Sequence, residues 1–259
     1  MDDSWDARTY DKVSGVLEEW GQRVLEQREW QGDEAVFDAG CGSGRPTRIL
    51  AAKVPRGTVY AVDMDHNMVL QAQANLRDFQ NVQVMQSDIV RVKLPAQVDV
   101  IFSNAVLHWI ADHEKVFANF AGLLKHGGEL VAQCGGQGNL ENALAIVEGV
   151  MADDPFRQHF TGWKNPWNFA APDDTEELLR KAGFKKARAY LSTEPVVFDS
   201  REQFSAYVRT VVIRPHLARL PSAQLRDMFP EECLDRCEKR PQKWLLDYVR
   251  LNIMAEKSQ

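Results

Sequence analysis

Residues 36–44 constrain the fold of this chain more than any other segment. An apolar strand there runs into a turn that carries glycine at alternate positions, namely Gly40, Gly42 and Gly44. Glycine has no Cβ and tolerates positive φ, so the main chain can fold tightly beneath a bound molecule. The next segment, 45–54, is predicted to be a helix whose first amides point at that molecule. We therefore expect this turn to bind a ligand.

A second apolar strand, 59–62, ends on Asp63. Its carboxylate is placed to accept hydrogen bonds from two ribose hydroxyls, because ligands of open α/β sheets bind in the crevice beyond the strand ends. The turn and Asp63 together predict a site for a nucleoside-bearing cofactor. A dinucleotide fingerprint, G-x-G-x-x-G, would require glycine at position 45, which is Arg45. Nicotinamide-dependent redox chemistry is thereby disfavoured.

The segment 38–44, D-A-G-C-G-S-G, resembles the first motif of class I S-adenosylmethionine-dependent methyltransferases. The resemblance extends in order from about residue 35 to 134. In the family, the residues matching Asp63 and Met64 hold the ribose and pack on the adenine, 87–89 contact the adenine amino group, and 98–104 lead to the methyl-transfer centre. The resemblance implies S-adenosylmethionine as cofactor. It also implies cofactor contacts from Asp38, Gly40, Cys41, Gly42, Gly44, Asp63, Met64, Ser87, Asp88, Ile89, Asn104 and Ala105.

The run 102–109 is most similar to small-molecule methyltransferases of the trans-aconitate and juvenile-hormone-acid type, which methylate carboxylates. The resemblance therefore implies O-methylation of a carboxylate, and we expect the substrate to be an apolar acid. A tryptophan matching Trp109 helps to hold the acceptor carboxylate in the insect enzymes, aided by a glutamine in the N-terminal helix. Here Leu17 matches that glutamine, and Gln22 or Arg23 are the candidates to replace it.

Methyl transfer is a direct displacement, so most of the rate can come from holding the reactants in line. A carboxylate acceptor is ionised at neutral pH and needs no base. A hydroxyl or phenol acceptor needs one, and His108 is then the candidate, with a structural histidine as the alternative. A cofactor-binding module without turnover is a further alternative.

Apolar periodicity predicts strands at 35–39, 58–62, 82–86, 98–103, 128–134, 186–198 and 245–255. Helices are predicted at 10–29, 45–54, 66–78, 113–125, 140–153 and 173–182. The expected fold is α/β, a Rossmann-like, seven-stranded, mostly parallel sheet flanked by helices, with a helical cap inserted before the last strand.

The whole chain, 1–259, is expected to be a single methyltransferase domain. Residues 1–30, including Tyr10, are predicted to form a helical cover over the cofactor. Residues 137–172 and 200–244 are predicted to be insertions that cap the substrate.

Composition narrows the partners of the chain. A net charge of −6 disfavours nucleic acid as a substrate, and no segment has the apolar length of a membrane span. The four cysteines form no disulfide framework in a chain of this length, and Cys233 with Cys237 lacks the further ligands of a metal site. We expect a cytoplasmic enzyme with a small-molecule substrate and without a metal, a nucleic-acid or membrane partner, or an obligate protein partner.

Overall fold

The computed structural model describes residues 15–258. The chain forms two compact units. The first, here called the sheet unit, consists within the described residues of 15–137, 167–192 and 250–258. The second, the helical unit, consists of 138–166 and 193–249. The assignment of the whole chain to one domain stays a prediction.

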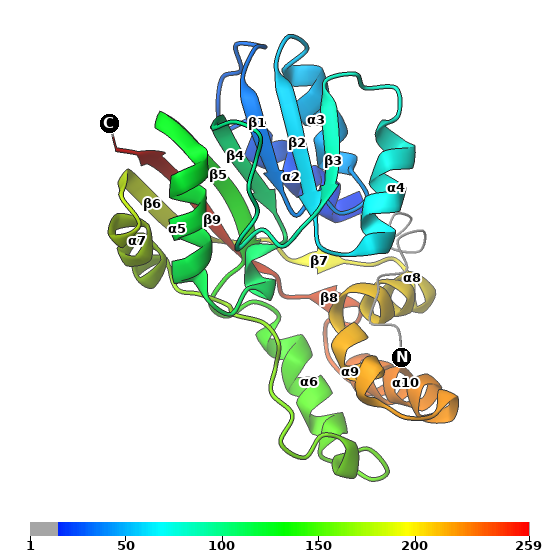
Figure 1. The fold of residues 1–259 in the computed structure, drawn as a ribbon. Coiled ribbons are helices and arrows are strands. Elements are labelled where there is room, and N and C mark those ends of the chain that lie inside the picture. Colours follow the sequence, from blue (N-terminus) through cyan, green and yellow to red (C-terminus); the bar gives the residue numbers. More distant parts are fainter. Residues whose placement is uncertain (1–14, 259) are drawn as a thin grey trace. The chain divides into compact units, whose positions relative to one another are not determined.

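The sheet unit is built on a seven-stranded sheet in the order β3-β2-β1-β4-β5-β9-β6 (Figure 1). The pairs β1–β2, β1–β4, β2–β3 and β4–β5 are parallel, and β9 is antiparallel to β5. The strands are β1 (Ala35–Ala39), β2 (Thr58–Asp63), β3 (Val82–Gln86), β4 (Val98–Asn104), β5 (Leu124–Gly135), β6 (Phe184–Thr193) and β9 (Val249–Lys257). The predicted seven-stranded, mostly parallel sheet is confirmed.

Helices bury both faces of this sheet. On one face, α2 (Gly15–Leu25) and α3 (Arg45–Lys53) share a core with β1, β2, β4 and β5, and α4 (His66–Leu76) packs beside α3. On the other face lie α5 (His113–Leu123) and α7 (Pro172–Lys181). Because both faces are covered, the central strands are almost continuously apolar, as in parallel sheets generally.

Most predicted boundaries agree with the structure to within two residues, but the sixth strand does not. The predicted strand 186–198 is divided into β6, which ends at Thr193, and β7 (Val196–Val197). Pro195 lies between them and has no amide to donate to a sheet ladder. The short β7 pairs instead with β8 (Leu245–Leu246), so the predicted last strand is also divided, into β8 and β9.

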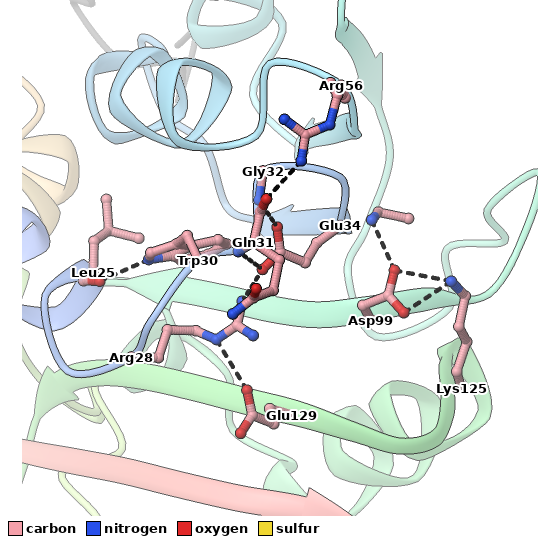
Figure 2. Close-up of polar contacts among 11 residues, drawn as sticks. Leu25, Arg28, Trp30, Gln31, Gly32, Glu34, Arg56, Asp99, Lys125 and Glu129 are labelled. Atoms are coloured by element: carbon pink, nitrogen blue, oxygen red, sulfur yellow. Dashed lines mark hydrogen bonds and ion pairs between the residues drawn. The ribbon is translucent and has the colours of Figure 1, made fainter.

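Polar side chains hold the connection between α2 and β1 at the amino edge of the sheet (Figure 2). Arg28 lies between Glu34, at 3.1 Å, and Glu129 of β5, at 2.9 Å. Close by, Asp99 accepts the main-chain amide of Ala35 and pairs with Lys125, each at 2.8 Å. The start of β1 is thereby attached to β4 and β5, and the carboxyl edge lies at the other end of these strands.

The helical unit contains α6 (Glu141–Met151), α8 (Arg201–Tyr207), a π-helical turn η3 (Val208–Val212), α9 (Arg214–Arg219) and α10 (Ala223–Glu238). Asp247 accepts amides at the start of α6, and an aromatic cluster contains Phe160, Trp163, His216 and Phe229. Residues 200–240 are largely helical. The substrate-cap role of 137–172 and 200–244 stays a prediction.

Candidate active site

The three glycines of the turn differ in the space that surrounds them. All have positive φ, +85° at Gly40, +54° at Gly42 and +87° at Gly44. A Cβ on Gly40 would lie 2.3 Å from Cγ2 of Val106, and one on Gly44 would lie 2.7 Å from Cδ1 of Leu76. A Cβ on Gly42 would meet no atom within 4 Å. Packing therefore excludes side chains at the two ends of the turn, and its centre has open space beside it.

Asp63 connects this turn to the end of β2. One carboxylate oxygen accepts the amide of Gly42 at 2.9 Å, and the other accepts the amide of Asp65 at 2.9 Å. Burial raises the pKa of Asp63, and these hydrogen bonds partly oppose the rise. Each oxygen has a second lone pair, so the carboxylate can also accept hydroxyl groups. Met64, the next residue, is 68% exposed, which is unusual for a large apolar side chain.

Two residues of the first motif have their side chains in the interior. Asp38 is buried and accepts the Thr47 hydroxyl at 2.6 Å. Burial raises its pKa to about 7, with Thr47 opposing and Asp63 adding to the rise. The Cys41 thiol is also buried, with a raised pKa. The two side chains therefore support the turn from within the core, and the cofactor contacts of Asp38 and Cys41 stay a prediction.

The segment after β3 lies beside Asp63, whose carbonyl accepts the amide of Ser87 at 2.9 Å. Asp88 accepts the amide of Val90 and keeps a side chain that is 30% exposed. The Ile89 side chain is buried in the core, so any cofactor contact from this residue would have to come from its main chain. The cofactor contact of Ile89 stays a prediction.

β4 ends on Asn104, and Ala105 follows with φ +59°. A positive φ is unfavourable for alanine and usually marks a functional constraint. Here it turns the chain so that Val106 packs against Gly40, while the Ala105 amide donates to Gln133 of β5 at 2.8 Å. The cofactor turn and the end of β4 are thus packed together.

His108 lies in a 3₁₀ turn, η1 (Leu107–Trp109), next to the end of β5. Its Nδ1 accepts the amide of Gly135 at 3.2 Å. Burial, then the charges of Arg250 and His113, holds the pKa of His108 well below its usual range. The ring is therefore neutral at pH 7, and with Nδ1 accepting, its proton is on Nε2. His108 presents a hydrogen-bond donor, not a basic nitrogen, on its other side.

Aromatic rings surround His108 within the sheet unit. The ring centroids of Trp109 and Phe169 lie 5.5 and 6.1 Å from that of His108, and Trp167 stacks on Phe169. The amide of Asn168 donates to the His108 carbonyl at 2.8 Å and attaches this segment to η1. The sequence predicts 137–172 as one insertion. The structure separates Trp167 and Phe169 from Trp163, which packs on His216 in the helical unit.

Three further candidate site residues were predicted in the N-terminal helix. Gln22 and Arg23 are exposed, and Gln22 donates to Glu26 on its own helix. Replacement of the family glutamine by either residue stays a prediction. Tyr10 lies outside the described residues, as does the whole of segment 1–14 of the predicted cover 1–30. The role of Tyr10 stays a prediction.

Comparison with known proteins identifies the family of this chain. A family model described as "Methyltransferase domain" matches residues 37–132. The trans-aconitate 2-methyltransferase of Klebsiella pneumoniae is 38% identical over 238 residues, which cover 86% of this chain and 86% of the relative. The chain belongs to the class I S-adenosylmethionine-dependent methyltransferases.

Further matches agree with this assignment. An uncharacterised methyltransferase of Schizosaccharomyces pombe is 24% identical over 99% of both chains. The crystal structure of the YcgJ protein of Bacillus subtilis has a TM-score of 0.64 at 16% identity and covers 92% of this chain and 98% of its own. At that identity the likeness shows the fold alone.

This methyltransferase is an enzyme, and S-adenosylmethionine is its cofactor. The alternatives of a nicotinamide enzyme and of a module without turnover are not supported. The residues present fit the cofactor: a carboxylate with accepting capacity, an exposed methionine beside it and a turn with open space at Gly42. None of the helices in residues 15–258 has the length and apolar character that a membrane span requires. In the same part of the methyltransferase, no three His, Cys, Asp or Glu side chains could together hold a metal ion.

Sequence reasoning missed a buried polar group at the carboxyl edge of the methyltransferase sheet. Arg250, Gln133 and Asn252 are each at most 5% exposed. The arginine and asparagine alternate with apolar residues in the last strand, a pattern typical of a strand with one polar face. The alternation was therefore a usable signal, but it suggested an exposed face. β9 is paired on both edges, between β5 and β6, and the face that carries Arg250 and Asn252 is buried.

Proposed function

We propose that this methyltransferase acts on a carboxylate oxygen of a small acid. The observation that carries the proposal is the hydrogen bond from Gly135 to Nδ1 of His108. It leaves an Nε2–H donor, which suits a carboxylate acceptor and does not suit proton removal from a hydroxyl or phenol. The relatives named trans-aconitate 2-methyltransferase, from Klebsiella pneumoniae and Deinococcus radiodurans among others, also support an acid as substrate.

The cofactor, when bound, supplies an electrophilic methyl group. We assign Asp63 to the ribose hydroxyls, Met64 to one face of the adenine, and Asp88 with Ser87 to the adenine edge. Gly42 permits close approach to the turn, because a side chain there would occupy the open space beside it. Asn104 and Ala105 stand at the end of β4, toward the reacting centre.

For the acceptor, we assign His108 to hold one carboxylate oxygen through Nε2–H, and Trp109 to bound the apolar side of the site with Trp167 and Phe169. A carboxylate needs no base, so these residues have only to orient the acceptor and exclude water. We also propose, from the sequence, that residues 137–172 and 200–244 cap the acceptor.

A mass-spectrometric screen tests the proposal directly. Purified enzyme and S-adenosylmethionine are incubated with mono-, di- and tricarboxylic acids, phenols, alcohols and amines, and products heavier by one CH₂ group are recorded. We expect gains on acids, trans-aconitate included. Methylation confined to phenols or amines would contradict the carboxylate proposal without affecting the family assignment.

Replacement of His108 separates a donor from a base. In His108→Gln the amide nitrogen can donate near the position of Nε2, so we expect turnover of the acid within about tenfold of the wild type. In His108→Ala a hydrogen bond to a charged group is lost, and the acceptor KM should rise roughly ten- to hundredfold. If His108 were a base, both variants would lose kcat to the same extent. The kcat of the wild-type enzyme would then also fall at pH values where His108 is protonated.

A further inference from the structure

Gly21 is a buried glycine in the interior of α2, the helix that packs on α3, β4 and β5. Alanine is the most favourable residue in a helix interior, and glycine is among the least favourable. Gly21 is not one of the glycines with positive φ, so alanine could adopt its backbone conformation without strain. The reason for a glycine at this position must therefore lie in what surrounds it.

The side chain of Asn104 occupies the space beside Gly21. A Cβ on Gly21 would lie 3.0 Å from Nδ2 and 3.6 Å from Cγ of Asn104, and 3.5 Å from Cγ of Pro46. The distance to the proline is an ordinary van der Waals contact, whereas the distance to the amide nitrogen is too short. An alanine at position 21 therefore fits beside the proline only if the neighbouring amide moves by a few tenths of an ångström.

The two backbones at this contact are held in place by other interactions. Asn104 pairs with Gln133 of β5 in the sheet, and the amide of Ala105 donates to the Gln133 carbonyl at 2.8 Å. On α2, the carboxylate of Glu18 pairs with Arg45 of α3 at 2.5 Å. Rotation about the side-chain bonds of Asn104 costs less free energy than displacement of a paired strand or a packed helix. The amide group of Asn104 is therefore the part that would move.

Asn104 lies on the face of the sheet that α2 and α3 cover. Alternate residues of a strand face opposite sides, and Val100 and Phe102 of β4 belong to the core shared with these two helices. Asn104 continues this series at the carboxyl end of the strand. Pro46, the other neighbour of the glycine, is in the first turn of α3, directly after the cofactor turn. Helix α2, the cofactor turn and the end of β4 thus meet at one glycine.

We propose that Gly21 is a positioning residue of the cofactor site. Its lack of a side chain leaves the Asn104 amide in the orientation that contacts S-adenosylmethionine, and an alanine would turn that amide away while favouring the helix. An amide has two donor hydrogens and two acceptor lone pairs, so it can bind a ligand while it is also bonded within the protein. The inference rests on the cofactor contact predicted for Asn104 and does not depend on the nature of the acceptor.

Gly21→Ala tests the inference because it should separate cofactor affinity from stability. Calorimetry with S-adenosylhomocysteine measures the affinity without an acceptor, and we expect its Kd to rise about tenfold, as for the loss of one hydrogen bond. The urea midpoint of unfolding should stay the same or rise, because alanine favours the helix. The matched control is Gly122→Ala in α5, where a new Cβ would meet no atom within 4 Å. It should keep or raise the midpoint and leave the Kd unchanged.

Asn104→Ala separates an effect through the amide from a displacement of the whole helix. Alone, it should raise the Kd for S-adenosylhomocysteine about tenfold. Adding Gly21→Ala should then raise the Kd by less than about a further twofold, because the amide that the new Cβ would displace is gone. A helix displaced as a whole would weaken binding whatever residue stands at 104, and the two effects would multiply to about a hundredfold.

The inference is overturned if Gly21→Ala binds S-adenosylhomocysteine as the wild type does, or if the effects of the two substitutions multiply. It is also overturned if Gly21→Ala fails to fold or has a lower urea midpoint that Asn104→Ala does not restore, since the helix would then be the part that moves. Wild-type affinity in Asn104→Ala would overturn it together with the cofactor contact predicted for that residue. The carboxylate proposal is tested separately, by the products of the acceptor screen.

Discussion

Gly42 differs from the other two glycines of the turn because the space beside it is open, while Val106 fills the space beside Gly40 and Leu76 that beside Gly44. Positive φ makes alanine unfavourable at all three positions, at about 1 kcal/mol each. At Gly40 and Gly44 a new Cβ would also clash with a neighbouring side chain. Substitution of Gly42 should therefore mainly weaken cofactor binding, whereas substitution of Gly40 or Gly44 should mainly destabilise the fold.

Gly42→Ala should lower the free energy of unfolding by about 1 kcal/mol and weaken S-adenosylhomocysteine binding about tenfold or more. Gly40→Ala should lower the free energy of unfolding by several kcal/mol, because the new Cβ would overlap the Val106 side chain and one of the two must move. Urea unfolding and calorimetry measure the two effects. Val106→Ala combined with Gly40→Ala is the control and should recover part of the stability. Wild-type cofactor affinity in Gly42→Ala would show that the open space is not the ligand's.

At the scale of elements, the connection between α2 and β1 depends on one carboxylate. Glu34 accepts the amides of Gln31 and Gly32, each at 2.9 Å, as well as the Arg28 guanidinium. Burial acts to raise the pKa of Glu34, but these main-chain hydrogen bonds, with the charge of Arg28, outweigh it, and the net pKa is lowered. The ionised carboxylate therefore stabilises the fold.

A lowered pKa in the folded state gives stability that is present above the unfolded value, 4.5, and is lost as pH falls through the folded value. Glu34→Gln should thus cost about 1–3 kcal/mol of unfolding free energy at pH 7, and the difference from the wild type should disappear in acid. Urea unfolding between pH 3 and pH 8 measures this. Glu177→Gln, which breaks an exposed ion pair with Lys181, should change little at any pH. A pH-independent deficit in Glu34→Gln would contradict the electrostatic explanation.

At the scale of the whole molecule, the described groups assigned to the cofactor all lie in the sheet unit. Hydrogen–deuterium exchange should therefore show that S-adenosylhomocysteine slows exchange in residues 39–45, 63–66 and 86–90. The amino-edge residues 28–34 and helix α10 should exchange as before. Protection centred on 201–238 in place of the sheet segments would contradict the assignment of the cofactor site.

The sheet and its cofactor turn were predictable because each depends on local patterns, apolar strands and glycine spacing, that are contiguous in sequence. The arrangement of the residues proposed to bind the acceptor could not be predicted in this way. Trp163 and Trp167 are close in sequence yet belong to different units, and Pro195 divides a strand that apolar periodicity joins. The burial of Arg250 arises only when β9 inserts between β5 and β6, a non-local event that no segment of the sequence encodes by itself.

The contact between Gly40 and Val106 has a consequence for how such a chain can diverge. Position 40 is in the cofactor turn, and position 106 immediately precedes the 3₁₀ turn that carries the proposed acceptor residues. A larger residue at 106, selected to reshape the acceptor side, would press on the turn that every substrate requires. New acceptor preferences should therefore evolve through substitutions at other positions, with the valine at 106 retained beside the glycine at 40.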